Sequence, residues 1–125
     1  MTAKLLVLVL GSVGLSALAQ ILLKHGMAAA PIQELLDRGP ASAAISGIAT
    51  DPHVLGGIAL YGLGMVLWLL VLARLDVSVA YPFVGLGFLL TMVLGITVLG
   101  EPFNASRLAG TLLVASGVFL VARSA

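Results

Sequence analysis

Four apolar stretches, each about as long as a membrane-spanning helix, constrain the fold of this chain more than any other feature. They cover residues 5–23, 54–73, 77–99 and 105–122, and the only charged residue inside them is Arg107. A helix needs roughly 20 apolar residues to cross the hydrocarbon core of a bilayer. The pattern therefore predicts four transmembrane helices.

The composition also favours a bilayer over water as the surroundings of this chain. Hydrophobic residues make up 61% of its 125 residues and charged residues only 9%, whereas soluble domains carry about 25% charged residues. A small soluble fold could not bury so much apolar surface. The alternation typical of barrel strands is absent. We predict an all-α fold, a single polytopic membrane domain over residues 1–125.

The connections between the predicted helices differ in length. Only residues 74–76 separate the second helix from the third, so these two should be antiparallel neighbours. The first connection, residues 24–53, is long. A helix beginning near Pro31 would place Ile32 and Leu36 on one face. We expect this segment to lie on the membrane surface.

The charged residues do not predict an orientation. The positive-inside rule gives no direction, because the basic residues divide evenly and insertion both ways is permitted. The net charge of +1 gives no reason to expect a nucleic-acid partner, and the absence of cysteine excludes disulfides. One end would carry Lys4, Arg74 and Arg123, and the other Lys24, Arg38 and Arg107.

The first predicted helix carries a polar stripe in which Ser12, Ser16, Gln20 and Lys24 recur every fourth residue. Residues at this spacing share one helix face. The stripe should line a cavity or another helix, because polar groups are costly to keep facing lipid. We predict Gln20 and Lys24 as substrate-binding residues. The serines are interpreted chiefly as packing residues, although Ser16 adjoins the predicted site.

Small residues mark one face of the fourth predicted helix, where Ser106, Gly110 and Gly117 are four and seven positions apart. Such faces allow close approach between helix backbones. We predict a subunit interface there. Gly57 and Gly64 in the second helix have the same spacing, and either pair could instead serve packing within one subunit.

Two aromatic residues near the ends of predicted helices could be interfacial anchors or contacts for a ligand. Motifs typical of enzymes are missing from the sequence. Tyr81, beside Pro82 in the first turn of the third predicted helix, could anchor the helix at the interface or donate a hydrogen bond to a substrate. Trp68 is interpreted as an interfacial anchor. The sequence has no phosphate-binding loop, no histidine cluster and no paired intramembrane carboxylates. We therefore expect neither an enzyme nor a metal or cofactor.

The segment Leu99-Gly100-Glu101-Pro102, followed by Gly110 and Gly117, resembles the C-terminal signature of the drug/metabolite transporter superfamily. Two branches of it consist of small four-helix chains. One is formed by the flippase subunits for aminoarabinose linked to undecaprenyl phosphate, and the other is the small multidrug resistance family.

The flippase branch fits better. Gln20 and Lys24 resemble its first-helix pattern, and residues 65–72 and 79–82 resemble its second and third helices. The multidrug branch uses an intramembrane glutamate in the first helix, which this sequence lacks. It also has an aromatic pocket residue where Phe83-Val84-Gly85 stands here.

The resemblance implies a dimeric flippase in a bacterial inner membrane, either a homodimer or a pair with a similar chain. Its substrate would be a polyprenyl-phosphate-linked sugar or a similar anionic lipid. Lys24 would attract the phosphate, while Gln20 and Tyr81 would donate hydrogen bonds. Arg107 would be a second phosphate contact or a residue that extends to the interface.

Two other functions remain as alternatives to lipid translocation. One is export of small organic cations or metabolites. The other is a non-transporting accessory subunit of a lipid glycosylation enzyme. A neighbouring gene for a sugar transferase would favour the flippase, and a neighbouring drug-responsive regulator would favour the exporter.

We expect no proton-coupled drug export, because no acidic residue lies within the predicted spans. Cells that express the chain should therefore be as sensitive to quaternary ammonium compounds as cells that do not. Growth in graded drug concentrations measures this, with membrane expression verified by immunoblot. Resistance that disappears when the proton gradient is collapsed would contradict the expectation.

Overall fold

A computed structural model describes residues 2–124, and within them it shows helices and no strands. The all-α prediction is confirmed, because four helices are long and apolar enough to cross a membrane. Their ends lie within four residues of the apolar stretches. The four spans are α1 (Ala3–Met27), α4 (Pro52–Leu72), the continuous segment α5 (Val77–Ala80), η1 (Tyr81–Phe83) and α6 (Val84–Thr97), and α7 (Ala105–Arg123).

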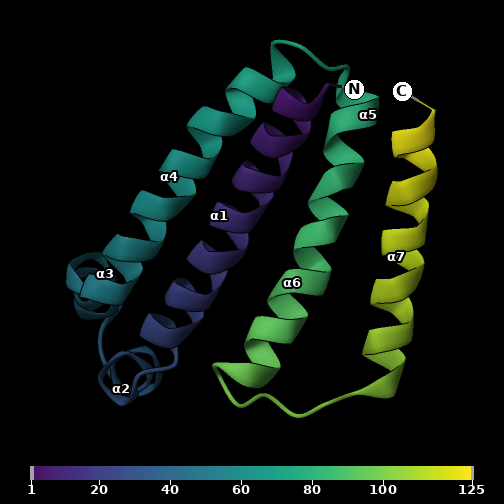
Figure 1. Cartoon of the computed structure of the whole chain (residues 1–125). Helices are drawn as coiled ribbons and strands as arrows, with labels where there is room; N and C mark the ends of the chain where they lie inside the picture. Colours follow the sequence, from purple (N-terminus) through teal and green to yellow (C-terminus); the bar gives the residue numbers. More distant parts are fainter. Residues whose placement is uncertain (1, 125) are drawn as a thin grey trace.

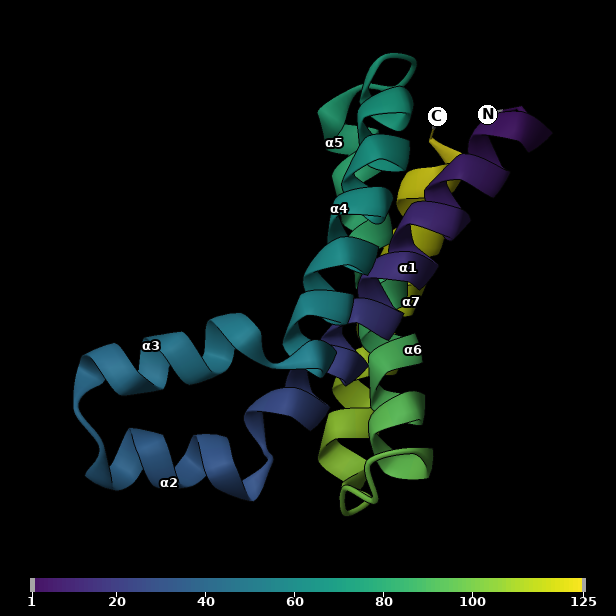
Figure 2. The ribbon, with the colours of Figure 1, turned by 90° about the vertical axis from the view of Figure 1, so that its left-hand side faces the viewer.

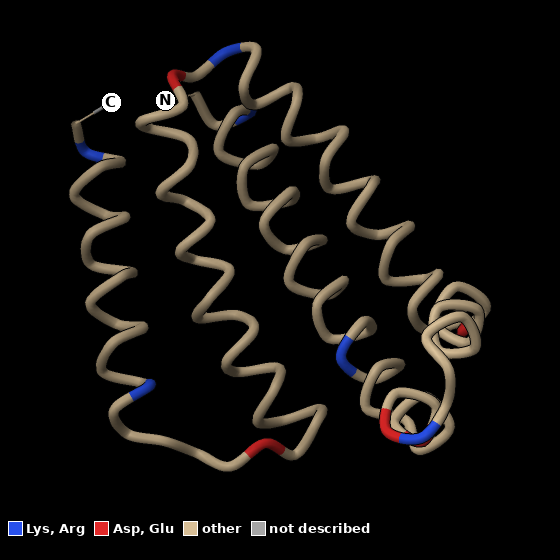
Figure 3. The backbone as a smooth tube through the Cα atoms, turned by 180° about the vertical axis from the view of Figure 1, so that it is seen from behind, with Lys and Arg blue, Asp and Glu red and all other residues tan. Residues whose placement is uncertain are grey.

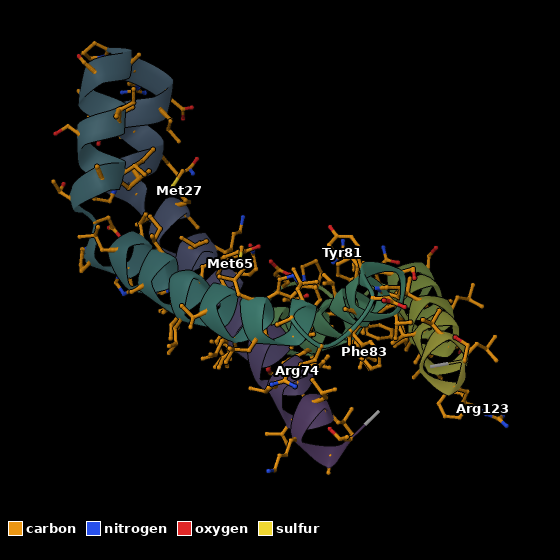
Figure 4. All side chains as sticks on the ribbon, turned by 90° about the horizontal axis from the view of Figure 1, so that it is seen from above. Met27, Met65, Arg74, Tyr81, Phe83 and Arg123 are labelled. Carbon is orange, nitrogen blue, oxygen red and sulfur yellow. The ribbon has the colours of Figure 1, made fainter. Side chains whose placement is uncertain are left out.

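The long helices lie side by side in the order α4, α1, α6, α7 (Figure 1). The helix α1 packs against α4 and α6, and α6 packs against α7. The edges of this layer are α4 and α7, which lie on opposite sides of the molecule (Figures 1 and 4). Basic residues occur at both ends of the layer (Figure 3), as the even division of lysines and arginines predicts.

Local sequence signals set where the helices begin. The Asp51 carboxylate accepts hydrogen bonds from the backbone N–H groups of His53 (2.9 Å) and Val54 (3.0 Å), which caps α4. The Asn104 side chain caps α7 by accepting from the N–H of Arg107 (3.0 Å). These contacts satisfy N–H groups that have no partner inside the helix.

The third span differs from its prediction, because Pro82 does not lie in the first turn. The span begins with α5, and Pro82 follows within η1, a tighter 3₁₀ turn. Proline has no N–H to donate to the carbonyl four residues earlier, which disfavours a regular α-helix at this point. Tyr81 and Phe83, on either side of Pro82, point to opposite sides of the span (Figure 4).

The long connection forms two helices where only one was predicted. The first, α2 (Ala30–Arg38), follows Pro31 as expected, and the second, α3 (Ala41–Thr50), is new. Together they form a hairpin that projects to one side, across the direction of the long helices (Figure 2). A Cβ at Gly47 would lie 2.7 Å from the Leu35 side chain, so this glycine allows α2 and α3 to pack closely. That this hairpin lies on the membrane surface stays a prediction.

Glycines of α4 allow the close packing of α4 on α1. A Cβ at Gly57 would lie 2.8 Å from the Leu23 side chain and 3.2 Å from the Ala19 carbonyl oxygen. A Cβ at Gly64 would lie 3.3 Å from the Ser12 carbonyl oxygen. These two glycines therefore serve packing within one subunit. The sequence alone left open whether they did so or formed a subunit interface.

The Gly57→Val substitution should destabilise the protein by about 1–3 kcal/mol, the usual cost of overpacking a close contact. Gly62→Val is the matched control, since a Cβ at Gly62 meets nothing within 4 Å. Thermal unfolding in mild detergent, followed by circular dichroism, measures the difference. Equal losses for the two variants would mean that valine in the helix, and not contact with α1, causes the effect.

Candidate functional site

A groove of about 520 Å³ runs between α1, α4 and α6. The polar side of α1 forms its base, as the stripe predicted, and α4 and α6 supply its walls. The lining also contains aromatic and aliphatic side chains, so the groove suits a ligand with polar and apolar parts. Its polar lining residues are Ser12, Ser16, Gln20, Tyr61, Tyr81 and Thr91.

A second groove of about 510 Å³ continues the first toward the start of α7. The two share Gln20, Phe88 and Thr91, so they form one path along α1 and α6. The second groove contains Lys24 and Arg107. All five predicted substrate-binding residues therefore lie along one path: Ser16 and Tyr81 in the first groove, Gln20 in both, and Lys24 and Arg107 in the second.

Residues of the stripe differ in what their side chains contact. The Ser12 hydroxyl is buried and donates a hydrogen bond of 2.8 Å to the Gly64 carbonyl oxygen. It therefore contributes to packing between α1 and α4. Gln20 and Lys24 are exposed, and no hydrogen bond to their side chains occurs within residues 2–124. Their polar groups are free to meet a ligand.

Aromatic residues line the walls of the first groove, among them the two that the sequence analysis discussed. Tyr81 is 64% exposed, so its hydroxyl can reach a ligand in the groove. Its neighbour Phe83 points the other way, into the core (Figure 4). Trp68, interpreted from the sequence as an interfacial anchor, is half-buried and lines the groove as well.

The second groove brings two basic side chains from different helices to one space. Lys24 lies near the end of α1 and Arg107 in the first turn of α7. Both are exposed, and in the described part of the chain the only contact within 4 Å between a basic and an acidic side chain is His53–Asp51. Neither side chain is held in an ion pair there, so both are free to attract an anion to this end of the groove.

Glu101 is a groove residue that the sequence reasoning did not select. It lies outside the apolar stretches, yet it lines the second groove with Lys24 and Arg107. Gly100, with a φ of +70°, turns the chain after α6, and the Glu101 N–H donates to the Gly95 carbonyl (3.0 Å). The combination of Gly100 and Pro102 is the sequence signal for such a return of the chain.

The predicted interface residues are on α7 and line neither groove. Ser106, Gly110 and Gly117 are exposed, and a Cβ at either glycine meets nothing within 4 Å. Only 6% of the most apolar stretch of α7 is buried within the subunit. This face therefore differs from that of Gly57 and Gly64, because nothing in the described chain covers it.

The sequence model of the family described as Small Multidrug Resistance protein matches residues 43–114. This segment runs from α3 into α7 and includes the walls of both grooves. The chain belongs to the Small Multidrug Resistance protein family. It is an integral membrane protein, and the resemblance drawn from the four-helix pattern and its C-terminal motif is confirmed.

Several proteins similar to this chain carry a more specific name. The chain is 46% identical over 68 residues to the "Probable 4-amino-4-deoxy-L-arabinose-phosphoundecaprenol flippase subunit ArnE" of Pseudomonas savastanoi pv. phaseolicola, covering 54% of this chain and 60% of the relative. It is 38% identical over 118 residues to the probable flippase subunit ArnF of Erwinia tasmaniensis, covering 93% and 92%.

A third relative, the uncharacterized protein y4nH of Sinorhizobium fredii, is 34% identical over 109 residues, with 86% of each chain covered. The chain spans only about 60% of the length of the ArnE relative. The matches to the ArnF and y4nH relatives cover most of this chain. No solved structure matches the chain.

Proposed function

We propose that this chain is one half of a dimeric flippase that moves a polyprenyl-phosphate-linked sugar, or a similar anionic lipid, across the membrane. The observation that carries the proposal is the placement of Lys24 and Arg107 on one groove, where neither side chain forms an ion pair within residues 2–124. The names of the ArnE and ArnF relatives support the same substrate class.

Each part of such a lipid matches a part of the groove. The phosphate is attracted by Lys24 as a point charge and by Arg107 through paired donors. The sugar hydroxyls meet the amide of Gln20 and the hydroxyls of Tyr81 and Thr91 along the path between the two grooves. The polyprenyl tail stays in the bilayer, so only the head group needs a polar route.

The absence of an acid in α1 separates this proposal from cation export. A cation exporter coupled to protons needs a carboxylate for which the two compete. The polar and charged residues of α1 include no acid: they are Lys4, Ser12, Ser16, Gln20, Lys24 and His25. A cation at Lys24 would be repelled. We infer transport of an anionic head group, and no catalysis.

The open layer of helices supports a dimer. Four helices in a single layer leave the outer face of α7 without a partner, and two-repeat transporters place their substrate between two such halves. The glycine face of α7 offers close backbone approach to a second chain. We propose that this second chain is either an identical copy or a similar four-helix chain.

Lys24→Met should lower lipid translocation roughly ten- to hundredfold, the loss expected when a charged hydrogen-bond partner is removed. Methionine keeps most of the length of the side chain and its apolar stem, and removes the charge. Gln20→Leu should show a weaker defect. The assay is the rate at which the head group of a polyprenyl-phosphate-linked sugar becomes accessible to a membrane-impermeant reagent in reconstituted vesicles.

Lys4→Met is the control for that experiment. Lys4 is exposed near the start of the same helix and lines neither groove. Wild-type rates in Lys24→Met would remove the phosphate-binding role. Equal losses in Lys24→Met and Lys4→Met would point to insertion or net charge as the cause.

Cysteines introduced at Gly110 or Gly117 should form crosslinked dimers in membranes, because the proposed interface places this face of α7 against a second chain. The protein has no cysteine of its own, so any crosslink reports the introduced residue. Gly62→Cys, on an open part of α4, is the control. Crosslinking at Gly62 but not on α7, in folded protein, would assign the interface to the other edge of the layer.

A further inference from the structure

Glu101 places a carboxylate against the backbone of α6, inside the groove that holds the two basic residues. A Cβ added at Gly95 would lie 2.6 Å from Oε2 of Glu101, so the carboxylate rests on the space that this glycine leaves open. The chain turn that brings it there is held by the backbone hydrogen bond from Glu101 to Gly95. The position of Glu101 is thus set by the backbone and not by a pairing of its side chain.

The second groove is lined by residues of opposite charge that do not form ion pairs with one another. Glu101, Lys24 and Arg107 all line it. Within residues 2–124, none of the three forms an ion pair within 4 Å, and the Glu101 carboxylate accepts no hydrogen bond. A partly buried carboxylate that has no partner is costly. A ligand that brings a positive group to Glu101 and a negative group to the basic pair would satisfy all three.

We propose that Glu101 binds a protonated amine on the head group of the transported lipid, so that the groove selects head groups that carry a phosphate and an amine together. This inference rests on the proposed function, because it takes Lys24 and Arg107 as the phosphate contacts. It adds a residue that determines specificity. A neutral sugar on the same phosphate would leave the carboxylate without a partner.

Three probes separate the amine from the phosphate. They are a short-chain polyprenyl phosphate that carries an amino sugar, its N-acetylated form, in which the nitrogen bears no charge, and the polyprenyl phosphate alone. Calorimetric titration of the full chain in lipid nanodiscs gives the affinity for each. Wild type should bind the amino form about tenfold or more tightly than the N-acetylated form, as expected for a charged hydrogen bond.

Glu101→Gln should bring this ratio close to one, because glutamine keeps the shape and removes the charge. The backbone bond to Gly95 does not depend on the side chain, so the turn should remain. Lys24→Met should weaken binding of all three probes. The two variants therefore report on different parts of the head group.

Gly95→Ala tests the same point if Glu101→Gln does not fold. The added Cβ must displace the carboxylate while the charge is retained, so the preference for the amine should fall without being lost. Gly62→Ala, where the added Cβ meets nothing within 4 Å, should keep the wild-type ratio.

Four results would overturn the inference. Equal affinity of wild type for the amino and N-acetylated probes would show that no amine is recognised, and the anionic-lipid function would stand. An unchanged preference in Glu101→Gln would place the amine elsewhere. If Glu101→Gln changed the affinity for all three probes by the same factor, Glu101 would be a structural residue in the connection before α7. Absence of binding of any probe to wild type would overturn the proposed function too.

Discussion

Close packing of α1 against α4 determines which face α1 presents to the groove. Gly57 and Gly64 lack side chains where the α1 backbone approaches, and the Ser12 hydroxyl donates to the Gly64 carbonyl. In lipid, helices associate through such close contacts and interhelical hydrogen bonds, because no hydrophobic force acts between them. With one side of α1 held in this way, Gln20 and Lys24 are left facing the groove.

The single layer of helices also explains why the fold looks incomplete as a single chain. A layer in the order α4, α1, α6, α7 covers α1 on two sides and leaves α7 covered on one (Figure 1). The groove lies along the middle of that layer, and its charged end involves the start of α7. A second chain against the glycine face of α7 would complete the structure without filling the groove.

The sequence predicted the long helices well, because hydrophobic length is a direct consequence of bilayer thickness. It also predicted the shared placement of Gln20 and Lys24, since their spacing fixes one face of a helix. It missed α3, whose small residues give a weaker amphipathic pattern than those of α2. It missed Glu101 and Trp68 as groove residues as well, because their positions depend on a chain reversal at Gly100 and on the packing of α4, which are tertiary properties.

We propose that the groove holds the head group of an anionic polyprenyl lipid at Lys24 and Arg107. A density map of the protein in lipid with bound polyprenyl-phosphate-linked sugar tests it most directly. We expect phosphate density within hydrogen-bonding distance of both side chains, with the sugar along the path toward Gln20 and Tyr81. A groove filled by a helix of the second chain, or a phosphate bound at the Lys4 end, would contradict it.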